Sequence, residues 1–198
     1  MKIFWRALPV FLLPLAADAY ETMYQKTKVG KIEVKEIPKR IALEATAKGP
    51  YFQGDNNLFR TLFRYISKNE VAMTVPVEAE MKPGKMRFFV GRKDAAKELA
   101  TTDAVEVREI EALTVVSIGI RGSYTQSRFK RYEEKLEEWL SQNDEFEAVS
   151  APYAVYWNSP FVPGIFKRSE IHLEVRKKSD QHQKEKLPGK EAPKPDES

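Results

Sequence analysis

The segment from Ile32 to Asn69, IEVKEIPKRIALEATAKGPYFQGDNNLFRTLFRYISKN, recurs without gaps from Val105 to Gln142 as VEVREIEALTVVSIGIRGSYTQSRFKRYEEKLEEWLSQ. Apolar residues also occupy corresponding positions in the two copies. Seven positions are identical: Glu33/Glu106, Val34/Val107, Glu36/Glu109, Ile37/Ile110, Gly49/Gly122, Tyr51/Tyr124 and Gln53/Gln126. Self-similarity at a fixed spacing indicates that one supersecondary unit occurs twice in the chain.

Each copy begins with strand patterns and continues with a helix pattern. Residues 32–34 and 41–47 are rich in β-branched residues and predict two strands joined by a turn at Pro38; residues 105–107 and 114–120 repeat them. Apolar residues at helical spacing then predict one amphipathic helix in each copy. These residues are Phe59, Leu62, Phe63 and Ile66 in the first copy, and Phe129, Tyr132, Leu136, Trp139 and Leu140 in the second.

Two further strand patterns follow each predicted helix, so each copy reads as a βαββ unit. The two halves span about residues 29–92 and 103–176. We therefore predict an α+β fold in which the duplicated unit forms a distorted antiparallel β-barrel or curved sheet with two helices packed on it. The seam between the halves is the natural place for a ligand groove.

The composition limits the classes of function. The chain has 198 residues, of which 42% are hydrophobic and 31% charged, enough for one sizeable core. It has no cysteine, which excludes disulfides, a thiolate nucleophile, a thiolate haem ligand and a cysteine zinc site. The net charge of +4 comes from interspersed basic and acidic residues, so we expect no nucleic-acid partner.

The two ends of the chain differ from its middle. Lys2 and Arg6 precede an apolar run over residues 7–16 and the small-x-small triplet 17–19, which is typical of a secretory signal peptide. We predict a signal peptide over residues 1–19, a periplasmic or secreted protein, and no stable membrane insertion after cleavage. The predicted domain covers residues 20–178, and a disordered C-terminal tail covers residues 179–198.

Several motifs in this order resemble the SOUL/haem-binding protein family, over about residues 29–176. They are Phe59-Arg-Thr-Leu-Phe-Arg-Tyr-Ile66, Asn69-Glu70, Met73-Thr74-Val75-Pro76-Val77, Trp157-Asn158-Ser159-Pro160 and Arg168-Ser-Glu-Ile171. The resemblance implies a distorted β-barrel with two helices, a fold also found in GyrI-like effector-binding domains. It further implies that haem or another tetrapyrrole binds in a shallow apolar groove beside the first helix.

On this resemblance, the first helix supplies much of the haem site. Phe59, Leu62 and Phe63 would form an apolar face for the porphyrin, and Arg60 and Arg64 would pair with its propionates. The alternative is that the aromatic stripe packs on the sheet as core and that both arginines are solvated.

A second set of predicted cofactor-binding residues lies near the end of the chain. Phe161 and Phe166, with Lys167 or Arg168, would close the opposite edge of the groove. The expected ligand is thus a small apolar molecule, a porphyrin, bound by a monomer.

An axial iron ligand is harder to identify. Some family members carry a histidine just after the first strand, where this chain has Glu36. His182 falls in the predicted tail, and His172 alternates with apolar neighbours, so it faces away from the apolar side. Met73 packs in the core, although its sulfur is a conceivable soft ligand. Tyr51 and Tyr124 are two further conceivable iron ligands, but little in the sequence supports either of them. We therefore predict reversible haem binding without a histidine ligand, and no dedicated metal site.

Two other functions remain open at this point. A GyrI-like hydrolase acting on a small hydrophobic molecule would need acid/base groups, for which Glu78, Glu170, Tyr65 and Tyr153 are available. A binding module for an apolar peptide or lipid would use the same groove. The leading interpretation is a haem or tetrapyrrole carrier or buffer that is not an enzyme and has no catalytic residues.

Overall fold

The computed structural model describes residues 20–53 and 57–179. The predicted signal peptide lies outside the described residues, and so does the predicted tail apart from Ser179. The elements follow in chain order as β1 (Glu21–Thr22), β2 (Ile32–Ile37), β3 (Arg40–Thr46), α1 (Leu58–Lys68), β4 (Thr74–Val75), β5 (Val77–Glu80), β6 (Lys85–Phe89), β7 (Glu106–Ile110), β8 (Leu113–Arg121), α2 (Gln126–Ser141), β9 (Phe146–Ala148), β10 (Tyr153–Tyr156), the short 3₁₀ helix η1 (Gly164–Phe166) and β11 (Arg168–Lys177).

The duplication predicted from the sequence is present in the fold. The order β2–β3–α1–β5–β6 in the first half returns as β7–β8–α2–β10–β11 in the second. The main sheet has the order β2-β8-β11-β10-β5-β6-β3-β7, with β9 paired to β11 outside this path. Exchanging the two halves and reading the order backwards reproduces the same order. The sheet therefore has a pseudo-twofold relation whose seam lies between β5 and β10.

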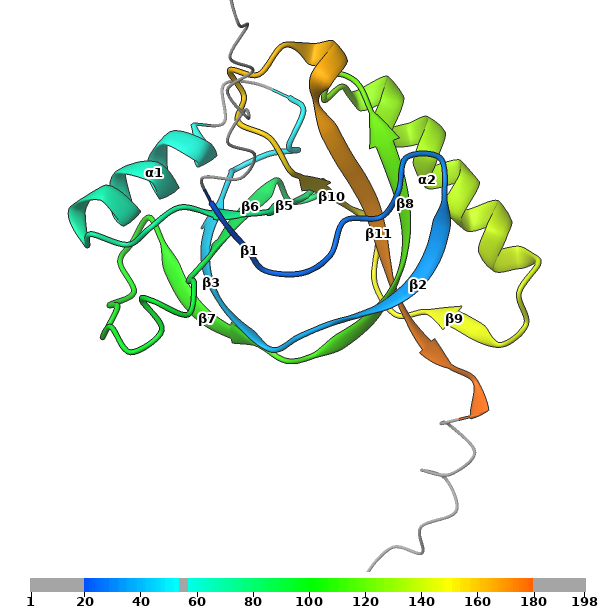
Figure 1. The fold of residues 1–198 in the computed structure, drawn as a ribbon, viewed down its shortest axis with the longest axis horizontal. Helices are drawn as coiled ribbons and strands as arrows, with labels where there is room; N and C mark the ends of the chain where they lie inside the picture. Colours follow the sequence, from blue (N-terminus) through cyan, green and yellow to red (C-terminus); the bar gives the residue numbers. More distant parts are fainter. Residues whose placement is uncertain (1–19, 54–56, 180–198) are drawn as a thin grey trace, which may run out of the picture.

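The first strand of each half pairs with the other half. β2 runs antiparallel to β8, and β7 runs antiparallel to β3, so the segments around Pro38 and Glu111 connect strands that do not pair with each other. These two crossings curl the antiparallel sheet into a half-barrel, with α1 at the left and α2 at the right of the view in Figure 1. The predicted α+β architecture with a curved sheet and two packed helices is confirmed.

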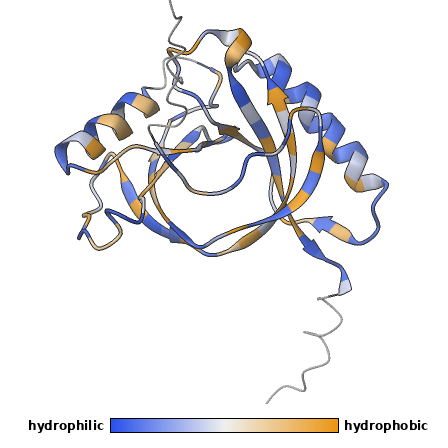
Figure 2. Cartoon of the chain, in the orientation of Figure 1, coloured by the Kyte–Doolittle hydropathy of each residue, from blue (hydrophilic) through white to orange (hydrophobic). Residues whose placement is uncertain are grey.

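The two helices cover the outer face of the sheet. Leu62 of α1 and Leu136 of α2 are fully buried in the larger hydrophobic cluster, which also takes in alternate residues of the strands. Thr125 begins α2 as its N-cap, accepting a hydrogen bond from the backbone of Arg128 at 3.3 Å. Most of α2 is coloured as hydrophilic in Figure 2.

The inner face of the sheet is covered by the chain's own N-terminal segment, residues 23–31. Tyr24 packs there in a second, smaller hydrophobic cluster with Tyr153 and Trp157. A side chain at Gly119 would collide with the carbonyl oxygen of Lys28, so glycine allows the segment to lie directly against β8. In Figure 1 this segment crosses the open side of the curled sheet.

Candidate ligand-binding site

A groove of about 560 Å³ lies beside α1, and we call it the α1 groove. Residues from the start of α1, from the β4–β5 segment and from the end of β10 form its walls. Val77 and Tyr156 both line it, and they are register partners across the β5–β10 seam. The groove therefore crosses the junction of the two halves, which the sequence repeat had indicated as the natural place for a groove. Its volume lies in the range of ordinary small-molecule sites.

Two of the predicted aromatic residues form the helical wall of this groove. The rings of Phe59 and Phe63 are stacked, with centroids 6.0 Å apart and planes 11° from parallel. Phe59 also packs edge-on against Phe88 of β6 at 5.2 Å, which fixes the pair on the sheet. Phe63 remains 50% exposed, so half of its apolar surface is available to a ligand.

The other predicted residues are distributed around the groove. Arg60 and Phe161 line it, from α1 and from the loop after β10. Leu62 is fully buried in the core behind α1, and Arg64 is exposed one turn beyond Arg60 without lining the groove. Two further predicted residues do not line it either: Phe166 is exposed on η1, and Arg168 begins β11.

Sequence reasoning did not assign the strand wall of the groove to the site. This wall contains Met73, Val75, Val77 and Tyr156. Burial raises the pKa of Tyr156, so its phenol stays protonated, and its ring stacks on that of Tyr124 at 4.2 Å. The family motifs at 73–77 and 157–160 were the sequence features from which this wall could have been predicted. Only the pairing of β5 with β10 brings them together.

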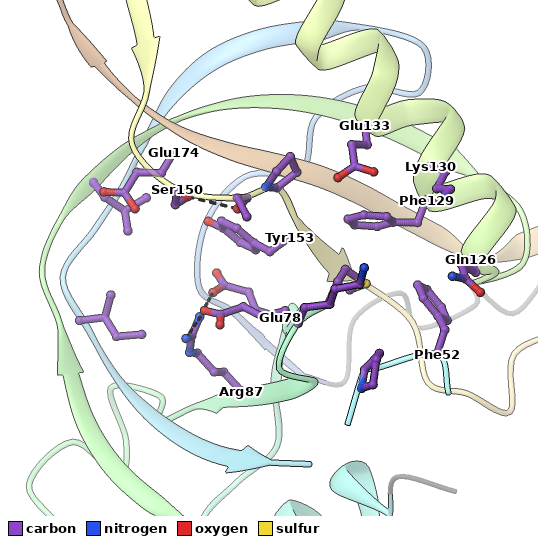
Figure 3. A pocket seen from close by; sticks show the side chains of 18 of the residues that line it. Phe52, Glu78, Arg87, Gln126, Phe129, Lys130, Glu133, Ser150, Tyr153 and Glu174 are labelled. Carbon is purple, nitrogen blue, oxygen red and sulfur yellow. Dashed lines mark hydrogen bonds and ion pairs between the residues drawn. The ribbon is translucent and has the colours of Figure 1, made fainter. Parts of the chain in front are cut away.

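A second cavity of about 670 Å³, the α2 cavity, lies beside α2 (Figure 3). Its lining comes from both halves of the chain and includes Glu78 of β5 and Tyr153 of β10. Its lining is rich in charged residues and includes Glu78, Arg87, Glu174 and, on α2, Lys130 and Glu133. Burial, followed by repulsion from nearby Glu137, raises the pKa of Glu133. The α2 cavity thus has more charged side chains in its lining than the α1 groove has.

The inner face carries a buried polar cluster centred on Glu170. Its carboxylate accepts hydrogen bonds from Lys35 Nζ and His172 Nε2, each at 2.7 Å. It also accepts from Thr27 N at 2.8 Å, Trp157 Nε1 at 2.7 Å and Ser117 Oγ at 2.9 Å. Burial alone raises the pKa of Glu170, but the bond to His172 and the charge of Lys35 outweigh it and hold the pKa at about 2.

Glu78 is the second buried carboxylate of this face. It pairs with Arg40 Nη2 at 3.0 Å and accepts a hydrogen bond from the Tyr24 hydroxyl, also at 3.0 Å. Tyr65, by contrast, donates to the backbone oxygen of Ala100 from α1 on the outer face. Glu78, Glu170, Tyr65 and Tyr153 therefore do not converge on one reaction centre, and both carboxylates are already paired.

His172 faces away from the apolar side of β11, as the sequence predicted, but the side that it faces is buried and not solvated. His172 faces opposite to Ile171 and Leu173, and it is fully buried between Tyr153 and Glu170. Burial lowers the pKa of His172 against the opposing effect of Glu170, so the imidazole is neutral at pH 7. It points away from the α1 groove. His182 lies outside the described residues.

The described residues contain no group of three or more histidine and acidic side chains placed to hold a metal ion. None of the helices in the same ranges is long and apolar enough to cross a membrane.

Comparison with solved structures gives the fold. The C-terminal domain of EcmrR is 18% identical, with a TM-score of 0.59, covering 74% of this chain and 98% of that one. A hydrolase from Listeria innocua is 12% identical, with a TM-score of 0.54, covering 77% of this chain and 94% of that one. These neighbours share the GyrI-like fold. At such identities the likeness concerns architecture alone.

Comparison with curated proteins returned no significant match. A model of the family described as SOUL heme-binding protein matches residues 18–174. The match covers both halves of the duplicated unit and both walls of the α1 groove. The chain therefore belongs to the SOUL heme-binding protein family.

Proposed function

We propose that this protein binds haem or another tetrapyrrole reversibly in the α1 groove and acts as a carrier or buffer for it outside the cytosol. One observation carries the proposal: an open apolar groove has the half-exposed ring of Phe63 and the side chain of Arg60 in its lining, and Arg64 is exposed one turn further along the same helix. Family membership supports the same ligand class. The signal-like sequence at residues 1–19 supports export.

The residues of the groove fit the chemistry of a porphyrin. A flat macrocycle buries best against apolar walls, which Phe59, Phe63 and Val77 supply. Its two carboxylates need cations, and neither Arg60 nor Arg64 forms an ion pair with another described residue. Each guanidinium is therefore available for a charge-assisted hydrogen bond to a propionate.

Binding in this groove needs no histidine ligand from the described chain. His172 is sealed on the inner face, and Met73 is the residue with a sulfur atom on the groove wall. When bound, haem supplies an iron centre whose properties depend on axial ligation. The protein's own residues hold the apolar rings and the propionates, an arrangement suited to reversible carriage.

The proposal is tested by titrating haemin into the chain from Tyr20 to Ser198, which retains every described residue, and following the Soret band. We expect a saturable, shifted band for the native sequence. Arg60→Glu/Arg64→Glu should weaken binding about tenfold or more, because the cation in the groove lining and the cation one turn beyond it both become anions that repel the propionates. The matched control is Lys130→Glu/Arg131→Glu, which makes the same charge change on α2 and should leave the titration unchanged.

Either of two results would overturn the proposal. An unshifted Soret band with the native sequence would exclude haem as the ligand. Equal weakening by the α1 and α2 variants would mean that net charge, and not the α1 groove, determines binding. Uptake of a fatty acid or an apolar peptide in place of haemin would favour the binding-module alternative.

A further inference from the structure

The loop over residues 158–168, which connects β10 to β11, exposes a concentrated set of large apolar side chains. Phe161 is 90% exposed, Ile165 70% and Phe166 62%, the three highest values for large hydrophobic residues in the described part of the chain. In Figure 2 the short helix η1 stands out as a hydrophobic element at one end of the molecule, beside the start of α2. Clustered exposure of this kind marks an interaction surface.

The loop is built to hold these side chains outward. Asn158 Oδ1 accepts a hydrogen bond from the backbone of Arg168 at 2.6 Å, which ties the two ends of the loop together. Lys167 Nζ donates to the carbonyl oxygen of Pro160 at 2.9 Å. Gly164 packs so closely on Ser123 that a Cβ there would collide with its hydroxyl. The apolar side chains thus project from a fixed support.

Basic residues surround this loop without acidic neighbours in the sequence. Residues 148–169 and 119–132 contain no aspartate or glutamate, and neither does α1. Arg121 and Arg168 are register partners at the ends of β8 and β11. Within residues 20–53 and 57–179, neither of these two arginines forms an ion pair with an acidic side chain. Lys39, which is far from the loop in sequence, instead contacts two glutamates.

This combination fits a lipid surface better than a protein partner. Projecting aromatic and aliphatic side chains enter the boundary between headgroups and acyl chains, while flanking arginines contact anionic headgroups. A stable protein interface would instead need a broad patch of complementary surface. We propose that the 158–168 loop docks the protein on the surface of an anionic lipid bilayer.

Docking in this way places the α1 groove next to the membrane. Phe161 belongs both to the exposed loop and to the wall of the groove. A lipophilic ligand could then pass between the bilayer and the groove without crossing open water. The docking itself depends on the loop and its arginines and not on the identity of the groove ligand, so it goes beyond the proposed function.

The test uses the chain from Tyr20 to Ser198, which lacks the apolar run at residues 7–16, and is made without haemin. Binding to phosphatidylcholine vesicles, with and without phosphatidylglycerol, is measured by co-sedimentation. We expect binding that requires phosphatidylglycerol and falls about tenfold or more in Phe161→Ser/Ile165→Ser/Phe166→Ser. The matched control, Val29→Ser/Val34→Ser/Val149→Ser, removes three other exposed apolar side chains and should bind as the native sequence does.

A second measurement reads insertion directly. In Phe161→Trp, the new indole should be quenched by brominated lipids in the anionic vesicles, and the native tryptophans of the parent chain give the baseline. The proposal fails if the native sequence does not bind anionic vesicles, or if the loop and control variants bind equally. It also fails if the loop variant changes only the sedimentation of the free protein, because that result would assign the loop to contacts between protein chains.

Discussion

The α1 groove and the inner face of the sheet are built from both halves of the chain, yet their chemistry is opposite. In the groove, the aromatic ring of Phe63 is half exposed and the cation of Arg60 has no acidic partner in the described chain. On the inner face, Glu170 and His172 are almost completely buried, and they are hydrogen-bonded to each other at 2.7 Å.

This difference in chemistry indicates that the α1 groove serves ligand binding and that the inner face serves the stability of the fold. An apolar surface left in water and a cation left unpaired both gain when a ligand arrives, because the ligand supplies the missing contacts. Paired charges in a sealed environment gain nothing further, and they lose much when one partner is removed. We therefore expect changes on the inner face to act on the free energy of unfolding, and changes in the groove to act on ligand affinity.

The largest effect is expected at the buried pair of Arg40 and Glu78. Arg40→Met leaves the carboxylate of Glu78 buried without its main counter-charge, which should lower the free energy of unfolding by about 3–5 kcal/mol. Urea unfolding measures this change. Arg60→Met makes the same substitution in the groove and should change stability by less than about 0.5 kcal/mol.

A double variant tests the cause of that loss. Arg40→Met/Glu78→Gln removes both charges and should recover part of the stability. If Arg40→Met and Arg60→Met unfold at the same urea concentration, the contrast between the two regions is wrong.

The next effect is a dependence of stability on pH, carried by Glu170. Its pKa is about 2 in the folded protein, against an ordinary value of 4.5. Because the pKa of Glu170 is lower in the folded protein than in the unfolded chain, its ionised carboxylate stabilises the folded protein at pH values above 4.5. This contribution to the free energy of unfolding is lost as the pH falls from 4.5 towards 2. The shift corresponds to about 3 kcal/mol at neutral pH, and Glu170→Gln should lose it.

The measurement is urea unfolding of both proteins over a series of pH values. The gap in unfolding free energy between the native sequence and Glu170→Gln should be constant above about pH 5 and narrow below pH 4.5. A gap that does not change between pH 7 and pH 3 would show that Glu170 is not stabilised as an anion.

Identities between two distant segments predicted the repeat, local periodicity predicted both helices, and the duplication together with the family resemblance predicted the curved sheet. Local periodicity has a limit. It could not predict the exchange of β2 and β7, because a strand has the same alternation whether it pairs within its own half or with the other. The alternation also gave the correct direction for His172. Its burial depends on Tyr24 and its neighbours, a segment that returns from far away in the sequence to cover the inner face.

The candidate site was predictable to a similar extent. Helical spacing and the family motifs identified Phe59, Arg60 and Phe63, which line the groove. The same spacing does not say which members of an apolar stripe meet the sheet, and this is why Leu62 was included with them. The loop residue Phe161 reaches the groove while Phe166 of the same loop does not, a difference set by the path of the loop and not by residue type.

The last prediction compares two adjacent residues of α1. Phe63→Ala should lower the free energy of unfolding by less than about 1 kcal/mol, because the ring is half in water. Leu62→Ala is the matched change on the buried side, and it should cost about 2–5 kcal/mol by opening a cavity in the core. Haemin affinity should respond in the opposite order, falling for Phe63→Ala and staying unchanged for Leu62→Ala while that variant remains folded. Urea unfolding and a Soret titration of the same two variants measure both quantities. If Phe63→Ala proved as destabilising as Leu62→Ala, the ring would belong to the core, and the groove would lose its main apolar wall.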